Sequence, residues 1–189
     1  ATGLVLFSRS KQTAKALRTR WRGPKCRREF LIVVEGDVTG ARGRITFPIG
    51  SADNSRGGGR RPVMAIEDGG RPAVTSWRLV ARGRGRSRIL ATIGGNRSQQ
   101  IRIHMAAIGH PLVNDRSYVE RATDVPLSAL VELPERYREI RKMPNYQIAM
   151  HAGRIEILHP VTDQVLEFHV PPPRLLLDLM PGAWVVDPS

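Results

Sequence analysis

The sequence is poor in cysteine, in long apolar runs and in clustered metal ligands, and each shortage excludes a class of protein. Its single cysteine, Cys26, excludes an internal disulfide and a metal site built from several cysteines. The five histidines are scattered along the chain, so we expect no metal site. No run approaches the roughly 20 apolar residues of a membrane-spanning helix. A cytoplasmic protein without a membrane partner is the simplest expectation.

The sequence carries a large excess of basic residues. Lysine and arginine number 30 against 17 aspartates and glutamates, which gives a net charge of +13 and an isoelectric point near 11.3. A cation that neutralises a phosphate releases condensed counterions, so this excess favours a polyanionic partner. Codon bias accounts for part of the preference for arginine over lysine, but not for the net charge. Nucleic acid or a ribonucleoprotein is therefore the favoured partner, ahead of an anionic membrane surface.

The apolar pattern predicts an α+β fold with a mixed, largely antiparallel sheet flanked by helices and basic loops. The 41% of hydrophobic residues suffices for a core, and 189 residues fit one domain or most of a larger one. Ser10 can cap the first predicted helix, and Gly109 can end the second. Strands and helices do not alternate strictly, which favours this sheet over a doubly wound one. Strands are predicted at 4–7, 30–34, 44–49, 73–80, 88–93, 148–150, 154–158 and 165–170, and helices at 11–21, 98–108, 127–143 and 175–180.

Two segments rich in glycine and arginine are expected to lie in loops. Residues 51–61 lack apolar periodicity, which predicts a mobile basic loop. The second segment, at 82–86, predicts a basic turn between two strands. We expect both to contact phosphates, which fixes the position of a nucleic acid and not its sequence. The arginines of these segments that we expect to bind RNA are Arg60, Arg61, Arg82, Arg84 and Arg86.

The predicted helix at 98–108 carries an arginine that needs a partner. Ile101, Met105 and Ile108 form its apolar stripe, at the i, i+4 and i+7 spacing of a helix that packs on a core. Arg102 lies beside this stripe, one turn into the helix, where free solvation is incomplete. Such an arginine requires a carboxylate or a phosphate. From the spacing alone, a structural salt bridge to an acid at the edge of the core is favoured over a functional role.

The segment at 96–118, NRSQQIRIHMAAIGHPLVNDRSY, resembles the signature of RluA-type RNA pseudouridine synthases. The usual form there is G-R-T-H-Q-I-R-x-H, followed by G-H-P-[LI]-x-G-D-x-x-Y. Three of the departures from this form matter: Gln99 replaces a histidine, and Asn96 and Asn114 replace glycines. Asparagine tolerates left-handed backbone better than most residues, so both replacements suit such positions. The matching residues are Arg97, Gln100, Ile101, Arg102, His104, Gly109, His110, Pro111, Leu112, Asp115 and Tyr118.

The resemblance extends over most of the chain, which implies one domain at 1–189. The first residues, at 2–6, are similar to the strand that follows the family's catalytic H-R-L-D segment. By this alignment the catalytic aspartate lies a few residues ahead of Ala1, and neither Asp37 nor Asp115 matches it. We therefore expect the catalytic domain of a pseudouridine synthase that lacks its N-terminal part.

The resemblance also implies roles for individual residues. Arg102 matches the arginine that forms an ion pair with the catalytic aspartate. Phe30 matches the aromatic residue, commonly tyrosine, that packs against the target uracil. Its aromatic face suits a base taken out of its stack, although the hydroxyl is missing. Arg97 and Gln100 either brace the helix or contact RNA.

The function implied by the resemblance is the isomerisation of uridine to pseudouridine in structured RNA, either ribosomal or transfer RNA. The aspartate acts as a covalent catalyst with no metal or organic cofactor, and the expected state is a monomer. Two other functions stay open. One is an inactive basic RNA-binding protein derived from the same fold, and the other is a ribosome-associated structural protein. Without the aspartate, we expect the 189-residue chain to bind RNA and to form no pseudouridine.

Overall fold

The computed structural model describes residues 1–52, 63–94, 97–119, 147–181 and 184–185. Its strands are β1 (Thr2–Gly3), β2 (Arg27–Glu35), β3 (Arg42–Ile45), β4 (Ile49–Ala52), β5 (Val63–Ile66), β6 (Thr75–Gly83), β7 (Arg86–Ile93), β8 (Met150–Leu158), β9 (Val165–His169) and β10 (Trp184–Val185). Its helices are α1 (Lys11–Arg22), α2 (Gln100–Ala107), α3 (Arg116–Val119) and α5 (Arg174–Leu177).

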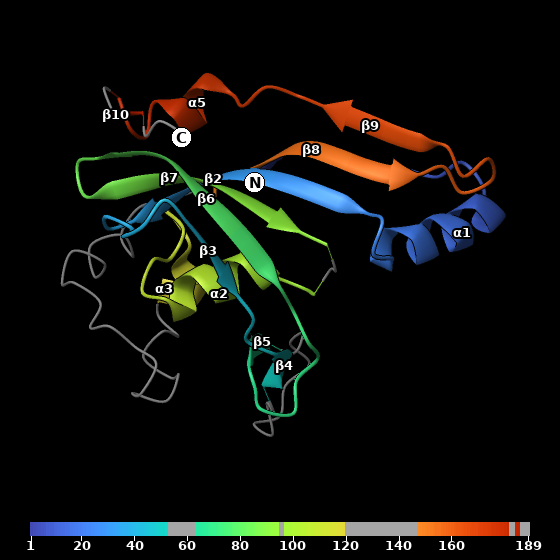
Figure 1. Cartoon of the computed structure of the whole chain (residues 1–189), viewed down its shortest axis with the longest axis horizontal. Helices are drawn as coiled ribbons and strands as arrows, with labels where there is room; N and C mark the ends of the chain where they lie inside the picture. Colours follow the sequence, from blue (N-terminus) through green and yellow to red (C-terminus); the bar gives the residue numbers. More distant parts are fainter. Residues whose placement is uncertain (53–62, 95–96, 120–146, 182–183, 186–189) are drawn as a thin grey trace.

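An eight-stranded sheet forms the centre of the described structure (Figure 1). Its order is β1-β8-β2-β7-β6-β10, with β3 paired to β6 and β9 paired to β8, while β4 and β5 form a separate hairpin. β1 runs parallel to β8, and the other described ladders are antiparallel. The predicted α+β fold with a mixed, largely antiparallel sheet is confirmed.

The strand β2 is buried on both faces because its apolar residues follow one another without a polar break. Ile32 and Val34 face α2, where they pack with Ile101 and Met105 of the predicted apolar stripe. Val33, between them, faces the opposite side and belongs to the core under α5. Successive side chains of a strand point to opposite faces, so β2 serves two cores at once. These two cores define an α2 face and an opposite face of the sheet.

The hairpin of β6 and β7 forms where the sequence predicts a basic turn. Arg84 and Gly85 both have positive φ, at 57° and 68°. Two successive residues in this conformation make the tight connection whose twist matches that of the two strands. The turn therefore projects from one end of the sheet.

The first predicted helix is confirmed together with its cap. The Ser10 hydroxyl accepts a hydrogen bond from the backbone N–H of Thr13 at 3.1 Å, which satisfies a free donor of the first turn. Leu17 and Trp21 of α1 pack against a small core that includes Cys26. This helix covers one end of β8 (Figure 1).

The strand predicted at 4–7 is wrong. β1 ends at Gly3, and the Leu4 N–H makes one further hydrogen bond to the Ala152 carbonyl at 3.0 Å before the chain leaves the sheet. Leu4 and Leu6 pack on the core beside α1, whereas Val5 is 67% exposed. Leu4 and Leu6 are apolar because one side of this irregular segment is buried, and such an alternation is also what a strand shows.

Two other boundaries differ from the prediction. The strand expected at 44–49 is divided into β3 and β4 at Pro48, which has no N–H to donate to a ladder. Of the strand expected at 148–150, only Met150 lies in a strand, and this strand, β8, continues through the one expected at 154–158. Gly153 is the extra residue of a β-bulge in β8, opposite Glu29 and Phe30. A glycine inside the apolar pattern therefore marks a bulge within a strand and not the end of the strand.

The remaining predictions are confirmed in part or lie outside the described residues. The closing helix expected at 175–180 forms as the shorter α5. The basic loop expected at 51–61 is wrong at Ser51 and Ala52, which belong to β4. The rest of this loop, with Arg60 and Arg61, and the helix predicted at 127–143 lie outside the described residues. No helix in the described part of the chain is long and apolar enough to cross a membrane.

Candidate functional site

Arg102 of α2 holds the carboxylate of Asp115 with two parallel hydrogen bonds. Its Nε donates to Oδ2 and its Nη2 donates to Oδ1, both at 2.6 Å. The Asp115 side chain is 0% exposed and that of Arg102 is 12% exposed. Nη1 of Arg102 donates to the Oε1 of Gln99 at 2.5 Å. The arginine thus has the carboxylate partner that its position requires, in the bidentate geometry that suits a guanidinium.

The turn after α2 brings Asp115 back to the helix. Gly109 ends the helix with a φ of 82°, and the Leu112 backbone forms a bridge with Val34 of β2. Asn114 then adopts a φ of 66°, the left-handed backbone that its side chain tolerates. This turn points the next side chain toward Arg102. The expected tolerance of asparagine at this position is confirmed.

An aromatic ring covers the Arg102–Asp115 pair from α3. The guanidinium carbon of Arg102 lies 4.7 Å from the centre of the Tyr118 ring, which is a cation–π contact. The Tyr118 side chain is 7% exposed, and its hydroxyl donates to the Met64 carbonyl at 3.3 Å. No role was predicted for Tyr118 from the sequence. Its place in the signature, four residues into the segment after Asn114, was the available signal.

Gln100 and His104 attach α2 to β6. The Gln100 amide donates to the Val74 carbonyl at 2.9 Å, and its oxygen accepts the Arg97 backbone N–H at 3.1 Å. His104 is hydrogen-bonded to the Thr75 hydroxyl at 2.8 Å, and burial lowers the pKa of its imidazole. Of the two roles left open for Gln100, its 3% exposure supports that of a brace.

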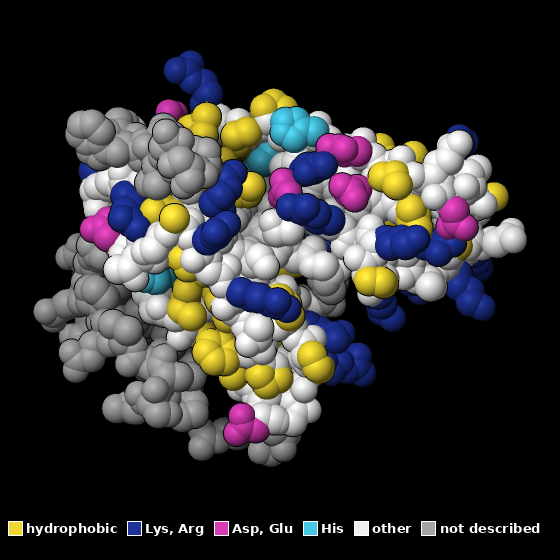
Figure 2. All heavy atoms as spheres, in the orientation of Figure 1, with side chains coloured by type: hydrophobic (Ala, Val, Ile, Leu, Met, Phe, Trp, Pro, Cys, Tyr) yellow, Lys and Arg dark blue, Asp and Glu magenta, His cyan; other side chains and the backbone are white. Residues whose placement is uncertain are grey.

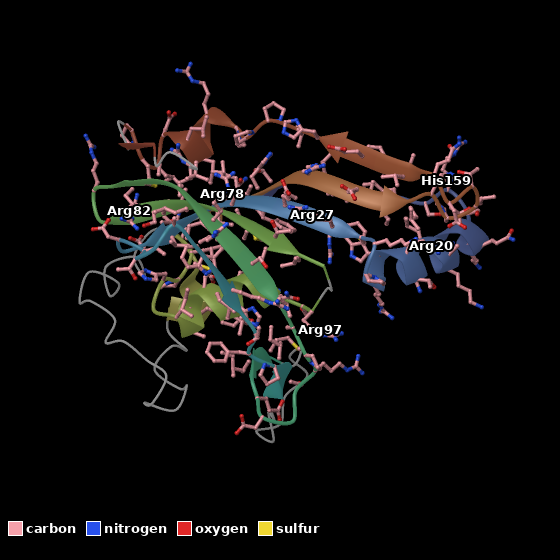
Figure 3. The ribbon with its side chains drawn as sticks, viewed as in Figure 1. Arg20, Arg27, Arg78, Arg82, Arg97 and His159 are labelled. Atoms are coloured by element: carbon pink, nitrogen blue, oxygen red, sulfur yellow. The ribbon has the colours of Figure 1, made fainter. Side chains whose placement is uncertain are left out.

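Arg97 is better placed for an outside partner. Its Nε donates to the Pro72 carbonyl at 3.1 Å, and the side chain is partly exposed at the end of α2 (Figure 3). The guanidinium therefore keeps donors that the described contacts do not use. A contact of Arg97 with RNA stays a prediction.

Phe30 lies on the same face of the sheet as α2. It is partly buried and packs against the core that contains Ile101 and Met105, the neighbours of Arg102 on the helix. The described contacts of Arg102 are with Gln99, Asp115 and Tyr118. The structure therefore places Phe30 and Arg102 on one side of the sheet without bringing the two side chains into contact.

The three arginines of the β6–β7 turn differ in their surroundings. Arg86 pairs with the buried Glu35 at 3.5 Å and donates to the Leu179 carbonyl at 3.2 Å. Arg82 donates to the Gly40 carbonyl at 3.0 Å, while Arg84 is exposed at the tip of the turn. Of these three predicted RNA-binding residues, Arg84 is the most accessible, whereas the side chain of Arg86 is used in contacts within the fold.

The start of the described chain lies near the turn that carries Asp115. Thr2 and Asn114 both line a cavity of about 300 Å³ between the sheet and α5. β1 pairs with the first residues of β8 in parallel, with Thr2 opposite His151. The described residues hold no group of histidine, cysteine, aspartate and glutamate side chains that could bind a metal ion.

Comparisons with known proteins agree with this fold. The sequence profile of a family described as RNA pseudouridylate synthase matches residues 1–107, a range that contains both Phe30 and Arg102. The solved structure of human RNA pseudouridylate synthase domain containing 1 matches with a TM-score of 0.67 and 20% identity, over 96% of this chain and 69% of that one. The fold is thus that of a pseudouridine synthase catalytic domain.

Curated relatives extend the match to nearly the whole chain. Ribosomal large subunit pseudouridine synthase D of Vibrio cholerae is 33% identical over 178 residues, which cover 94% of this chain and 51% of the relative. The protein of the same name from Salmonella typhimurium is 31% identical, over 95% of this chain and 51% of the relative. The chain belongs to the RNA pseudouridylate synthase family, as the signature predicted. It spans about half the length of the curated relatives it matches.

Proposed function

We propose that this chain forms most of the catalytic domain of an enzyme that isomerises uridine to pseudouridine in RNA. The observation that carries the proposal is that Arg102 of α2 and Phe30 of β2, the two residues that match the family's site, lie on the same side of the sheet, where Phe30 packs with Ile101 and Met105 of α2. Family membership supports the same conclusion. The net charge of +13 suits an RNA substrate.

The reaction exchanges one bond to the ribose for another. The bond between N1 of uracil and C1′ of the ribose breaks, the uracil turns, and C5 bonds to C1′. The proton on C5 leaves to solvent, and N1 gains a proton, so the product is an isomer of the substrate. A base has to leave its stack for this exchange, and Phe30 offers an aromatic surface against which it can pack.

In this proposal, Arg102 orients and keeps ionised the aspartate that attacks the nucleoside. A guanidinium that forms two parallel bonds fixes the plane of a carboxylate as well as its charge.

We further propose ribosomal RNA as the substrate. The relatives named above are ribosomal large subunit pseudouridine synthases, and their similarity covers more than nine-tenths of this chain. Transfer RNA is the other substrate predicted from the sequence, and it is therefore tested beside ribosomal RNA.

One observation favours a second candidate, an inactive RNA-binding protein with the same fold. Asp115 and Gln99 occupy the Nε, Nη1 and Nη2 groups of Arg102, so the arginine already has a structural partner. A structural salt bridge is also what the spacing alone favours. RNA binding without isomerisation is the outcome that this candidate requires.

Release of the C5 hydrogen tests the proposal. Ribosomal RNA and transfer RNA that carry tritium at C5 of uridine are incubated separately with the protein as its gene encodes it. We expect tritium release from ribosomal RNA, and a loss of about a hundredfold or more in the Arg102→Lys variant, because lysine cannot form the bidentate contact. Arg154→Lys, on β8, is the matched control and should retain the wild-type rate.

Two results would change the assignment. Release from transfer RNA alone would replace the proposed substrate. No release from either RNA, while both are bound, would establish the inactive RNA-binding protein instead. Equal rates for the wild type and Arg102→Lys would remove Arg102 from the reaction.

A further inference from the structure

Part of the sheet face opposite α2 is open to solvent and strongly basic. A shallow groove of about 500 Å³ crosses β2, β7, β6 and β3 on this face, beyond the area that α5 covers. Its lining includes Arg27, Arg42, Arg44, Arg78, Leu90 and Thr92. Arg27 and Arg78 are labelled on this face in Figure 3. Phe30 of β2 pairs with Ala91 of β7, so these two side chains point to the same face of the sheet. Leu90, the neighbour of Ala91 on β7, therefore points to the face opposite Phe30.

The strand register brings like charges directly opposite one another. Arg42 of β3 is the cross-strand partner of Arg78 of β6, and Arg44 lies two residues further along β3 on the same face. Like charges at directly opposite positions destabilise an antiparallel pair. All three side chains are exposed, and burial therefore does not account for their arrangement.

A close contact on the other side of the sheet fixes this register. Gly43, between the two arginines of β3, lies opposite Trp77, and a Cβ atom at Gly43 would come within 2.6 Å of the Trp77 ring. The indole packs on the α2 face core, so it has little room to move. β3 therefore presents Arg42 and Arg44 outward in a fixed position relative to Arg78.

These three arginines have no acidic partner among the described residues, unlike their neighbours on the same face. Arg154 of β8 pairs with Glu29, Glu156 and Glu167 at distances of 3.5, 3.4 and 2.7 Å, and Arg27 also pairs with Glu29. Figure 2 shows acidic side chains beside basic ones over β2 and β8. A solvated sheet face is normal, but it usually intersperses the two signs of charge.

We propose that Arg42, Arg44 and Arg78 bind the phosphate backbone of the RNA substrate on the face opposite Phe30. The inference rests on the proposed function for the identity of the polyanion. Residues two apart on a strand are about 7 Å apart, a separation similar to that of successive phosphates along a nucleic-acid chain. A guanidinium binds a phosphate through two parallel hydrogen bonds. The negative charge of the phosphate offsets the repulsion between the three arginines.

The position of β3 explains how one RNA could reach both faces. β3 pairs with β6 and lies at the edge of the described sheet. An RNA that holds its target base near Phe30 on the α2 face would meet Arg42 and Arg44 as it passes around this edge. The contacts are to the backbone, so they position the RNA without reading its sequence.

The salt dependence of binding tests this site. The probe is a fluorescein-labelled RNA stem-loop with uridines in its loop, and its affinity is measured by anisotropy over a range of potassium chloride concentrations. In a variant with R42Q, R44Q and R78Q, the slope of log K against log salt should fall by about 2, and the affinity at low salt by about tenfold or more. The matched control carries K11Q, K15Q and R18Q on α1, which removes three exposed cations elsewhere. Its slope should change by less than half as much.

Each other outcome decides against the site or against its ligand. A wild-type slope in the first variant, or an equal change in both variants, would reject a local phosphate site. Competition by polyglutamate as effective as that by polyuridylate would assign the cluster to an acidic protein. Thermal unfolding of the first variant should occur at the wild-type temperature or above it, because the substitutions relieve repulsion; a large decrease would make a structural role the explanation.

The tritium assay separates this inference from the proposed function. If the wild type releases tritium and the variant with R42Q, R44Q and R78Q keeps the wild-type salt slope, the proposed enzymatic activity is supported and the proposed phosphate site is rejected. If the salt slope falls in this variant and the wild type releases no tritium, the phosphate site is supported and the catalytic proposal is rejected.

Discussion

The same residue type has opposite surroundings on the two faces of this sheet. On the α2 face, Arg102 is nearly buried and forms two hydrogen bonds to a carboxylate that is 0% exposed. On the opposite face, Arg42 lies across from Arg78, and both are exposed without an acid among the described residues. The first arrangement stabilises the fold, whereas the second lowers its stability until an anion binds. We therefore expect substitutions on the α2 face to lower stability, and those on the open face to change binding.

The largest effect on stability is expected at Asp115. The Asp115→Asn variant keeps the shape of the side chain but leaves Arg102 as an uncompensated, nearly buried charge, which should lower the free energy of unfolding by about 3 kcal/mol. Urea denaturation measures the difference. Asp37→Asn removes an exposed carboxylate and serves as the control, with an expected change within about 0.5 kcal/mol. Equal values for the two variants would show that the pair contributes nothing to the fold.

A smaller effect on the same face depends on pH. Burial lowers the pKa of His104 below its usual value near 6.5, so the unfolded chain binds its proton more readily than the folded one. The stability from a neutral His104 is fully present above pH 6.5 and is lost as the pH falls toward the folded pKa. Denaturation midpoints at a series of pH values should therefore depend less on pH in His104→Gln. The exposed His169→Gln is the control, and an unchanged slope in the first variant would contradict the prediction.

The ring over Arg102 should contribute less still. Tyr118→Leu removes the aromatic face from the guanidinium and should lower stability by about 1 kcal/mol relative to Tyr118→Phe, which keeps the ring and loses only the hydroxyl. Thermal unfolding of the two variants isolates the ring from the hydroxyl. If Tyr118→Leu were as stable as Tyr118→Phe, the stacked ring would not contribute.

The smallest change in stability is expected on the sheet face opposite α2, where the substitution should stabilise the protein and not destabilise it. Arg78→Glu replaces a like pair with an opposite pair across from Arg42, which should raise the free energy of unfolding by about 0.5 kcal/mol. The same variant should bind the RNA stem-loop more weakly than Arg78→Gln. Denaturation and anisotropy on both variants measure the two effects. A loss of stability in Arg78→Glu beyond that of Arg78→Gln would show that no repulsion exists between the two strands.

Local signals predicted much of the fold. The apolar run of β2 and the Ser10 cap of α1 depend on neighbouring residues, and both are confirmed. The predicted strand at 4–7 was wrong because an apolar stripe on an irregular segment resembles a strand. The division of β3 from β4 could have been read from Pro48, whose missing N–H interrupts a ladder.

The site was predicted in part. The spacing on α2 required a carboxylate or a phosphate for Arg102, and the family resemblance provided Phe30 and the positions around Arg102. The finding that Asp115 pairs with Arg102 needed the turn through Asn114, which folds a residue 13 positions away onto the helix. Arg42 and Arg44 were not singled out among 30 basic residues, although their spacing around Gly43 places them on one side of any strand.

The sequence by itself determined the family, the periodicity of the main elements and the excess of positive charge, because each is a property of residues near one another or of the whole composition. The tertiary structure decided which arginines are compensated. Arg102 met Asp115 through a turn, and Arg42 met Arg78 through the pairing of β3 with β6. Electrostatic energy depends on separation in space and on exposure to water, and neither follows from position along the chain.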